Sequence, residues 1–333
     1  MSRGATAMPG RPEYVGGLGA MSGPPSRKDS SMFQSVEEVQ QHFRDARYIA
    51  GRRISTVVYL AARMGRPVLI EGPAGVGKTE LAKTLAEITG RPLIRLQCYE
   101  GLDESKALYE WKYAKQLLYT QLLRERIGEL IADAPSLPDA VARIAGQEDA
   151  FFSHRFLSPR PLLAAIESEQ PVVLLIDEID KAEPEFEAFL LEVLSDFQVS
   201  VPELGTIRAR HIPLVVLTSN NARELSDGLK RRCLHLFIDF PPPAEELEII
   251  RLKVPEISDQ MARAVVAAVQ KIRAMDLRKP PSVSESLDWA RSLVILNAQT
   301  LDAAIVESTL TLLVKYEKDL ERVRGALDKV LAD

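Results

Sequence analysis

The sequence predicts an α/β domain built on a parallel sheet, followed by a small all-helical domain. Short apolar runs such as residues 172–176 do not alternate between apolar and polar positions, which is typical of parallel strands buried on both faces. Helical patterns lie between these runs, so strands and helices alternate along the chain. Three prolines at 241–243 end this alternation, and every later pattern is helical. The later helices include two expected apolar stripes, one formed by Met261, Val265, Val269 and Ile272 and the other by Tyr316, Leu320, Val323 and Leu327. We therefore expect an α/β domain at 34–240 and a helical domain at 241–333.

Residues 1–33 are expected to form a disordered tail, because they are rich in Gly, Pro, Ser and Arg and lack a hydrophobic period. Order should begin at Ser35, since Ser35 and Glu38 have the spacing of a capping box, and helices should continue to about Met64. The five expected strands are residues 67–70, 93–98, 172–176, 214–217 and 234–238.

Two segments between the strands have patterns of their own. The interval between the second and third strands exceeds a usual crossover, so residues 114–150 should form a helical insertion. The insertion is either a surface for a partner or substrate, or a packed addition to the domain. Residues 199–207 have the pattern of a hairpin around a Pro-Gly turn.

Composition indicates a soluble protein of the cytoplasm. The 333 residues have a formal net charge of −5, so we expect no general surface for nucleic acid. No apolar run approaches the roughly 18 residues of a membrane span, and the glycine-broken run at 15–21 is not a signal-peptide core. Cys98 and Cys233 lack the spacing of metal ligands and are expected to be reduced strand residues.

Residues 72–79 read GPAGVGKT, the pattern of a phosphate-binding loop. Its glycines let backbone N–H groups face a phosphate chain, and the positive end of the following helix faces the same anion. Lys78 would reach the outer phosphates and the Thr79 hydroxyl would bind Mg²⁺. The alternative is a glycine-rich turn that caps a helix, but strand, loop and helix follow in the order that phosphate binding needs. The predicted nucleotide-binding residues are Gly72, Pro73, Ala74, Gly75, Val76, Gly77, Lys78, Thr79 and Glu80.

Two carboxylates follow the buried run at 172–176. Asp177 lies at the carboxyl end of this expected strand, where open parallel sheets bind their ligands, and Glu178 comes next. A phosphate-binding loop together with one carboxylate for a metal and one as a base indicates nucleotide hydrolysis. The alternative is a buried strand followed by a solvated helix cap.

Asn220 and a basic pair extend the candidate site. Asn220 ends the strand that should neighbour the Asp177 strand, so its amide could orient the attacking water or contact the γ-phosphate. Alternatively, it is an ordinary turn residue. Arg231 and Arg232 precede the last strand. They form either a solvated turn or an arginine supplied to the site of a neighbouring subunit.

Together these motifs resemble those of AAA+ ATPases. Within this superfamily the chain is similar to the MoxR branch, and especially to its CoxD type, which is associated with maturation of molybdenum-containing carbon monoxide dehydrogenase. The resemblance covers residues from about 35 to 333. The segments that carry the finer likeness are IRLQCYEG at 94–101, YEW at 109–111, EFEAFLLE at 185–192 and PSVSE at 281–285.

The resemblance implies ATP and Mg²⁺ as ligands, and a ring, often a hexamer, with nucleotide sites between subunits. It also implies a partner protein with a von Willebrand A domain. The implied roles are Lys78 and Thr79 for phosphate and metal, Asp177 for the metal, Glu178 as the base that activates water, Asn220 as the first sensor and Arg232 as the arginine finger.

One position departs from the family pattern. Many relatives have a second-sensor arginine at the start of a lid helix, where this chain has a capping box from Ser282 to Glu285. Arg291, or Arg278 upstream, could replace it. In relatives, hairpins in the region of 199–207 can face the centre of the ring; the alternative for this chain is an ordinary connector.

The sequence therefore predicts an ATP-driven remodelling chaperone that matures a metalloenzyme. The alternative is a nucleotide-gated scaffold that recruits a partner without work-coupled hydrolysis. Glu178 favours the enzyme, because a switch needs no base at that position. The absence of an Asn-Lys-x-Asp motif argues against a GTPase, and the formal net charge of −5 argues against an AAA+ protein that acts on DNA.

Overall fold

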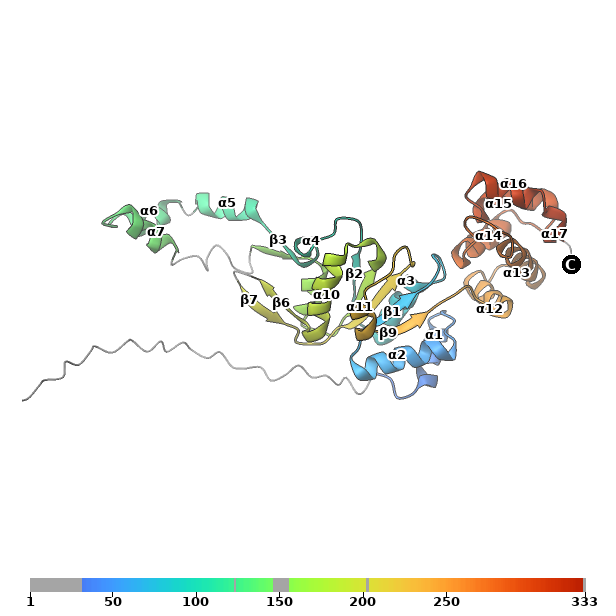
Figure 1. The fold of residues 1–333 in the computed structure, drawn as a ribbon, viewed down its shortest axis with the longest axis horizontal. Coiled ribbons are helices and arrows are strands. Elements are labelled where there is room, and N and C mark those ends of the chain that lie inside the picture. Colours follow the sequence, from blue (N-terminus) through green and yellow to red (C-terminus); the bar gives the residue numbers. More distant parts are fainter. Residues whose placement is uncertain (1–31, 123, 146–155, 202–203, 332–333) are drawn as a thin grey trace, which may run out of the picture.

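The computed structural model describes residues 32–122, 124–145, 156–201 and 204–331. Positions 1–31 of the expected tail lie outside the described residues. Phe33 is already buried, in the same core as Phe43. Figure 1 shows the α/β domain in the middle of the molecule, the C-terminal helices at one end and a helical arm at the other.

The centre of the α/β domain is a five-stranded parallel sheet with the order β2-β5-β8-β1-β9. Its strands are β1 (Val68–Glu71), β2 (Leu93–Gln97), β5 (Val173–Asp177), β8 (Leu214–Ser219) and β9 (Leu234–Phe237). All five strands predicted from the sequence are present. Asn220 directly follows β8, and the prediction that this strand neighbours the Asp177 strand is confirmed, because β5 and β8 pair.

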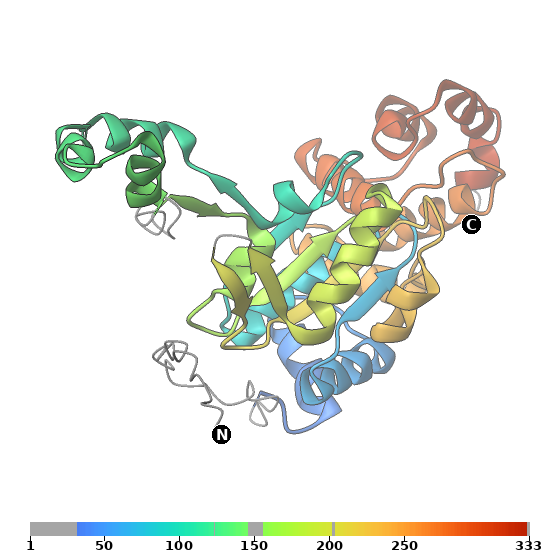
Figure 2. The ribbon, with the colours of Figure 1, turned by 60° about the vertical axis from the view of Figure 1, so that its left-hand side comes forward.

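Both faces of the sheet are buried, which explains why its strands lack alternation. Along β5, Leu174 and Ile176 belong to one hydrophobic core, whereas Val173 and Leu175 belong to the other. Figure 2 shows helices on both sides of the sheet. The helices of this domain body are α1 (Val36–Asp45), α2 (Arg52–Met64), α3 (Lys78–Thr89), α4 (Glu104–Leu108), α9 (Pro161–Ile166), α10 (Pro184–Asp196) and α11 (Asp227–Arg232), with a short 3-10 turn, η1 (Ile179–Lys181). With both faces covered, a ligand must reach the sheet at the ends of its strands.

The first helix has the predicted cap but not the complete capping box. Ser35 Oγ accepts a hydrogen bond from Glu38 N–H at 3.1 Å. The Glu38 carboxylate accepts from Gln34 N–H instead of Ser35 N–H, since it reaches one residue further back. α2 ends at Met64, as predicted, and Gly65 closes it in the left-handed conformation.

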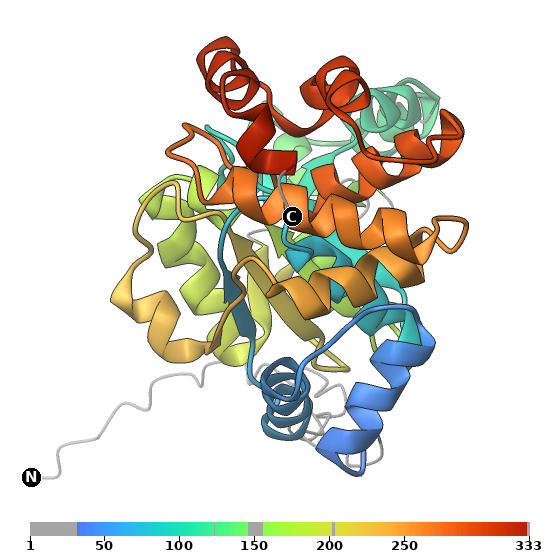
Figure 3. The same ribbon diagram turned by 90° about the vertical axis from the view of Figure 1, so that its right-hand side faces the viewer.

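The C-terminal helices form a second domain around their own core. The side chain of Trp289 is fully buried at its centre and donates from Nε1 to Thr309 Oγ1 at 2.8 Å. Figure 3 shows these helices stacked on the α/β domain. They are α12 (Pro243–Lys253), α13 (Asp259–Arg273), α14 (Val283–Ile295), α15 (Ala303–Leu313), α16 (Glu317–Arg324) and α17 (Leu327–Leu331). The apolar stripe predicted from Met261, Val265, Val269 and Ile272 lies buried on α13 in this core.

The second predicted stripe is not one helix face. α16 ends at Arg324 and α17 begins at Leu327, so the stripe crosses a break at Gly325. Tyr316 precedes α16 and is 37% exposed, and the Arg278 guanidinium lies over its ring at 4.2 Å from the centroid. The hydrophobic period in the sequence continues through Gly325, whereas the helix ends just before this residue.

The prolines at 241–243 lie between the two domains. β9 ends at Phe237, and Pro243 is the first residue of α12. Proline is tolerated there because the first turn of a helix leaves backbone N–H groups unpaired in any case. The α/β alternation ends at these prolines, as the sequence indicated.

A helical arm and a hairpin extend the α/β domain. The arm leaves between β3 (Tyr109–Trp111) and β4 (Leu157–Pro159), which pair antiparallel, and Figures 1 and 2 show it projecting from the body. It contains α5 (Tyr113–Leu122), α6 (Arg124–Ile131) and α7 (Leu137–Ala145). The helical insertion is thus present up to residue 145, and 146–150 lie outside the described residues. β6 (Gln198–Val201) and β7 (Gly205–Arg208) form the predicted hairpin, whose residues 202–203 are likewise not described.

Among the helices that the structure describes, none combines the length and the apolar character needed to cross a membrane.

Candidate active site

The phosphate-binding loop lies between β1 and α3, at the carboxyl ends of the parallel strands. Gly72, Gly75 and Gly77 have φ angles of +149°, +74° and +94°, a region that residues with a Cβ rarely adopt. Space also excludes a side chain, because a Cβ on Gly72 would lie 1.9 Å from the carbonyl oxygen of Ile238. The loop therefore meets the backbone requirement of a phosphate cradle.

Lys78 begins α3 and points into this loop. Its ammonium donates to Gly72 O at 2.7 Å, Pro73 O at 2.7 Å and Asn220 Oδ1 at 2.8 Å. The side chain is buried, and this burial lowers the pKa of Lys78 although nearby carboxylates oppose the shift. All three N–H groups of this buried ammonium donate to neutral acceptors. Phosphate oxygens can replace some of these acceptors, and their negative charge stabilises the ammonium more strongly.

Thr79 and Asp177 lie side by side next to the loop. Thr79 Oγ1 donates to Asp177 Oδ1 at 3.0 Å. Asp177 is 1% exposed, and it also accepts from Thr218 Oγ1 at 2.5 Å and from Arg95 at 2.6 Å. A hydroxyl and one carboxylate are oxygen ligands that Mg²⁺ uses together with nucleotide phosphates and water. Among the described residues, no three His, Cys, Asp or Glu side chains converge on a metal site. Thr79 and Asp177 fit the predicted Mg²⁺ site on these terms.

Glu178 is held in a strained backbone conformation by several partners. Its φ of +58° is left-handed, which costs free energy for a residue with a Cβ and is common at functional sites. Its N–H donates to Thr218 Oγ1 at 2.9 Å. Its carboxylate accepts from Asn220 Nδ2 at 3.0 Å and Gln97 Nε2 at 2.9 Å, and pairs with Lys181 at 2.6 Å. The side chain remains 31% exposed, so water can reach the carboxylate.

Asn220 connects Lys78 to Glu178. Its Oδ1 accepts from the ammonium and its Nδ2 donates to the carboxylate. Asp180 fixes the turn after β8, because its Oδ2 accepts from Asn220 N–H at 3.1 Å and Ala222 N–H at 2.9 Å. The sequence-predicted residues that the structure brings together here are Lys78, Thr79, Asp177, Glu178 and Asn220.

Several residues of the site were missed by the sequence reasoning: Arg95, Gln97, Asp180, Lys181 and Thr218. Arg95 and Gln97 are alternate residues of β2, and Gln97 lies directly opposite Asp177 in the sheet register. The alternation of polar residues along β2 was the available signal. Its use required the order of the strands, which places β2 beside β5.

A cavity of about 250 Å³ opens beside the loop, between the two domains. Its walls come from the segment between α1 and α2, the phosphate-binding loop, α12 and α14. Apolar side chains such as Ile49, Ile249 and Leu287 line it, with charged groups such as Glu245 and Lys253. Such a cavity, apolar with a few polar groups, suits the organic part of a nucleotide whose phosphates lie in the loop.

The lid helix α14 contacts the phosphate-binding loop directly. Ser284 N–H donates to Gly75 O at 3.2 Å, and Ser284 Oγ donates to the same oxygen at 3.3 Å. The predicted capping box is complete, with Ser282 and Glu285 each accepting from the other's backbone N–H. The start of α14 therefore touches the loop through backbone and serine groups.

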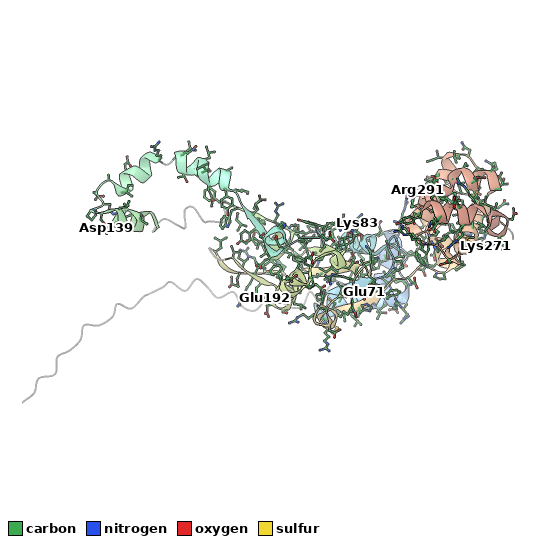
Figure 4. All side chains as sticks on the ribbon, turned by 45° about the horizontal axis from the view of Figure 1, so that its top comes forward. Glu71, Lys83, Asp139, Glu192, Lys271 and Arg291 are labelled. Carbon is green, nitrogen blue, oxygen red and sulfur yellow. The ribbon has the colours of Figure 1, made fainter. Side chains whose placement is uncertain are left out.

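The two candidates for a second-sensor arginine occupy different places. Arg291 lines the cavity between the domains, and Figure 4 shows it on the helical domain next to the α/β domain that carries Glu71. Arg278 lies over the Tyr316 ring, and the cavity's lining does not include it. Of the two, Arg291 is the one that lies on the wall of this cavity.

Arg231 and Arg232 lie apart from the loop residues of their own chain. Both end α11 and are exposed. Arg232 Nε donates to Ser195 Oγ at 2.7 Å, and both arginines line a different cavity. The structure thus does not bring Arg232 together with Lys78 or Glu178 of its own chain.

Comparison with known proteins gives an independent result. Residues 67–233, half of the chain, match the AAA domain of the dynein-related subfamily. Gas vesicle ATPase GvpN1 of Halobacterium salinarum is 25% identical over 220 residues, which are 63% of this chain and 57% of that protein. Chaperone protein ClpB of Bacillus cereus is 27% identical over 179 residues, 51% of this chain and 17% of that protein. The RuvB Holliday junction branch migration motor of Thermotoga maritima is similar in structure, with a TM-score of 0.45 and 17% identity over 90% of this chain and 80% of that chain. The chain thus spans little more than half the length of the first of these relatives.

Proposed function

Because the chain belongs to the dynein-related subfamily of AAA domain proteins, we propose that it hydrolyses ATP to ADP and phosphate. The observation that carries this proposal is that the Asn220 amide is hydrogen-bonded to both Lys78 and Glu178. An ammonium for the phosphates and a carboxylate for water lie on either side of one amide. A structural turn needs neither the buried lysine nor the strained glutamate.

The chain's own groups divide the reaction between them. The loop and Lys78 bind the β- and γ-phosphates, and the cavity beside the loop holds the nucleoside. Asn220 orients the attacking water, and Glu178 accepts its proton as the water oxygen bonds to the γ-phosphorus. The bond between this phosphorus and the β–γ bridging oxygen breaks in the same step, and ADP leaves. Mg²⁺ held by Thr79 and Asp177 would supply positive charge against the phosphate oxygens. Closure of α14 over the loop would exclude bulk water from the site.

The complete site in this proposal needs a second subunit. The subunits form a ring, often a hexamer in the MoxR branch that the chain resembles, and Arg232 of one subunit stabilises the transition-state charge in the next. Support comes from Arg232 itself, which is exposed and lies apart from the site of its own chain. An arginine supplied in this way contributes on the order of 10³-fold or more to turnover in related reactions.

The energy would serve the remodelling of a client protein in the cytoplasm. The CoxD-like resemblance suggests a metalloenzyme client, such as a molybdenum-containing carbon monoxide dehydrogenase, and a partner with a von Willebrand A domain. Relatives named as a gas vesicle ATPase and as a ClpB chaperone support an ATPase of chaperone type, although they share only part of their length with this chain. The arm offers exposed apolar side chains for a client, among them Tyr113, Leu122 and Leu137.

The test of this function is capture of the client in defined nucleotide states. Glu178→Gln should bind ATP without turning it over and should retain the client and the partner, whereas Lys78→Ala, which cannot bind ATP, should lose both. Removal of residues 114–145 should weaken client capture more than basal ATP turnover. Capture that is indifferent to nucleotide, together with full maturation of the metalloenzyme in cells that have only Glu178→Gln, would favour the nucleotide-gated scaffold instead.

A further inference from the structure

A second cavity, of about 940 Å³, lies at the other end of β1 from the phosphate-binding loop. Arg66 and Pro67, which precede β1, form part of its wall, whereas the loop follows β1. The remaining walls come from the end of α10, the β6–β7 hairpin and the end of α11. This cavity is therefore separate from the site of its own chain.

The second cavity is strongly basic. Among its described lining residues, the charged side chains are four arginines and one carboxylate: Arg66, Arg208, Arg231, Arg232 and Asp196. The chain as a whole has a formal net charge of −5, so this concentration of positive charge is local. An anionic ligand is the complement of such a surface.

Arg208 and Arg232 are held in matching ways. Arg232 donates from Nε to Ser195 Oγ at 2.7 Å, and Arg208 donates from Nε to Gln198 Oε1 at 3.0 Å. The two acceptors flank Phe197, where α10 passes into β6. Both acceptors are neutral, and in the described part of the chain neither guanidinium has a carboxylate partner within ion-pair distance. Within the described residues, the terminal nitrogens of both arginines are therefore available to a ligand.

Arg66, in the same cavity, binds backbone carbonyl groups at the end of α11. Its guanidinium donates to the carbonyl oxygens of Arg231 at 2.6 Å, Arg232 at 3.2 Å and Cys233 at 3.4 Å. The last carbonyls of a helix lack partners within the helix, so Arg66 fixes the end of α11 on which Arg232 stands. It is a positioning residue, and its Nε and one of its two terminal nitrogens are already used.

We propose that Arg208 acts together with Arg232 on the phosphates of ATP bound by the next subunit of the ring. This inference rests on the proposed function, since it needs a neighbouring copy that presents its nucleotide. A triphosphate offers several anionic oxygens, and two planar guanidiniums from different elements can bind separate oxygens in paired hydrogen bonds. Because Arg208 lies on the β6–β7 hairpin, nucleotide contact across the interface would also fix that hairpin.

The experiment compares Arg208→Ala with a matched control. Arg210→Ala removes the same charge two positions away, where the side chain is exposed and pairs only loosely with Glu169 at 3.7 Å, outside the basic cavity. ATP turnover per subunit and ATP binding are measured at protein concentrations that form rings. Arg208→Ala should bind ATP normally but turn it over at least about tenfold more slowly, the scale of a hydrogen bond to a charged group. Arg210→Ala should match the unmodified protein.

Mixing subunits separates action on a neighbour from a structural role. Arg208→Ala subunits keep Glu178, and Glu178→Gln subunits keep Arg208, so mixed rings contain some pockets with both groups. The mixture should be more active than either variant alone. If Arg208 only supported the hairpin of its own subunit, mixing would restore nothing, and the proposal would be overturned.

The failure of this inference can be told from failure of the proposed function. Full turnover by Arg208→Ala with lost turnover by Arg232→Ala would reject Arg208 and leave the shared site intact. Full turnover by both variants, without dependence on protein concentration, would reject the shared site and this inference with it. If Arg208→Lys folds and binds ATP but turns it over slowly, a planar guanidinium is needed at this position. Full activity of Arg208→Lys would reject that need.

Discussion

Glu178 and Asn220, which follow neighbouring strands of the sheet, are joined by a hydrogen bond of 3.0 Å from Nδ2 to Oε1. The other end of the same amide accepts from Lys78 at 2.8 Å. If Lys78 moves toward a phosphate, Asn220 loses a donor and can reorient, which changes the support of the base. The presence of a γ-phosphate and the position of Glu178 are thus linked through one side chain.

Replacing Glu178 with Gln should separate ATP binding from hydrolysis. The amide keeps the size of the side chain but cannot accept a proton from water, so turnover should fall at least about a hundredfold, the scale of a lost general base. ATP affinity should be little changed in an equilibrium binding assay. Lys78→Ala should lose affinity itself, because it removes the buried ammonium from the loop. Near-normal turnover by Glu178→Gln would remove Glu178 from the mechanism.

Replacing Asn220 with Ala should mainly lower kcat. The variant leaves the Lys78 ammonium one acceptor short and frees Glu178 from one of its donors. We expect turnover to fall on the order of tenfold to a hundredfold, as for a hydrogen bond to a charged group. ATP affinity should change less, because the two loop carbonyls and the phosphates still hold Lys78. An effect confined to KM would place Asn220 in binding alone.

The strands and the phosphate-binding loop were predictable because their signals are local in the sequence. Apolar runs such as residues 172–176 and the glycines before Lys78 need no knowledge of distant contacts. Gln97 was missed because its contact with Glu178 depends on β2 pairing with β5, across about 80 residues of chain. The break at Gly325 was missed for the opposite reason, since the hydrophobic period continues through a residue where the helix stops.

Replacing Gly75 with Ala should weaken ATP binding through the lid. A Cβ at this position would lie 2.3 Å from Ser282 Oγ, and the φ of +74° adds backbone strain. Either the loop or the start of α14 must shift, so we expect affinity to fall on the order of tenfold or more, the scale of local strain at a functional site. Gly51→Ala is the matched control, because a Cβ there meets nothing within 4 Å. Equal affinity of the two variants in a titration with labelled ATP would contradict this account.

Replacing Arg273 with Ala should destabilise the helical domain. Arg273 makes a bidentate pair with the fully buried Glu246, at 2.6 and 2.7 Å, and its loss leaves a buried carboxylate without its cation. Breaking such a pair costs about 3–5 kcal/mol of unfolding free energy. In a Trp111→Phe background, Trp289 alone reports this domain in denaturant titrations by fluorescence, because the chain has 2 tryptophans.

The control for that loss is an exposed ion pair in the same domain. Arg263 pairs with Asp259 at 2.8 Å on the surface of α13, and Arg263→Ala should change the unfolding free energy by no more than about 1 kcal/mol. If Arg273→Ala and Arg263→Ala lowered the unfolding free energy by similar amounts, the buried pair would contribute no more to stability than the exposed pair.

The two cysteines should make stability fall at alkaline pH. Burial raises the pKa of Cys98 to about 12, with a further contribution from Asp177, and burial raises the pKa of Cys233 to about 12. In the unfolded chain both thiols ionise from about pH 8.5 upward, whereas in the folded chain they stay protonated. Since the unfolded state then binds fewer protons, their contribution is complete below pH 8.5 and is lost as the pH rises toward 12. Denaturant midpoints measured between pH 7 and pH 10 should therefore fall more steeply than in a Cys98→Ala, Cys233→Ala variant.

Alkylation tests the burial of the same two thiols directly. At pH 8 it should label neither thiol in the native protein and both after unfolding. Rapid labelling of the native chain would contradict the burial of these thiols.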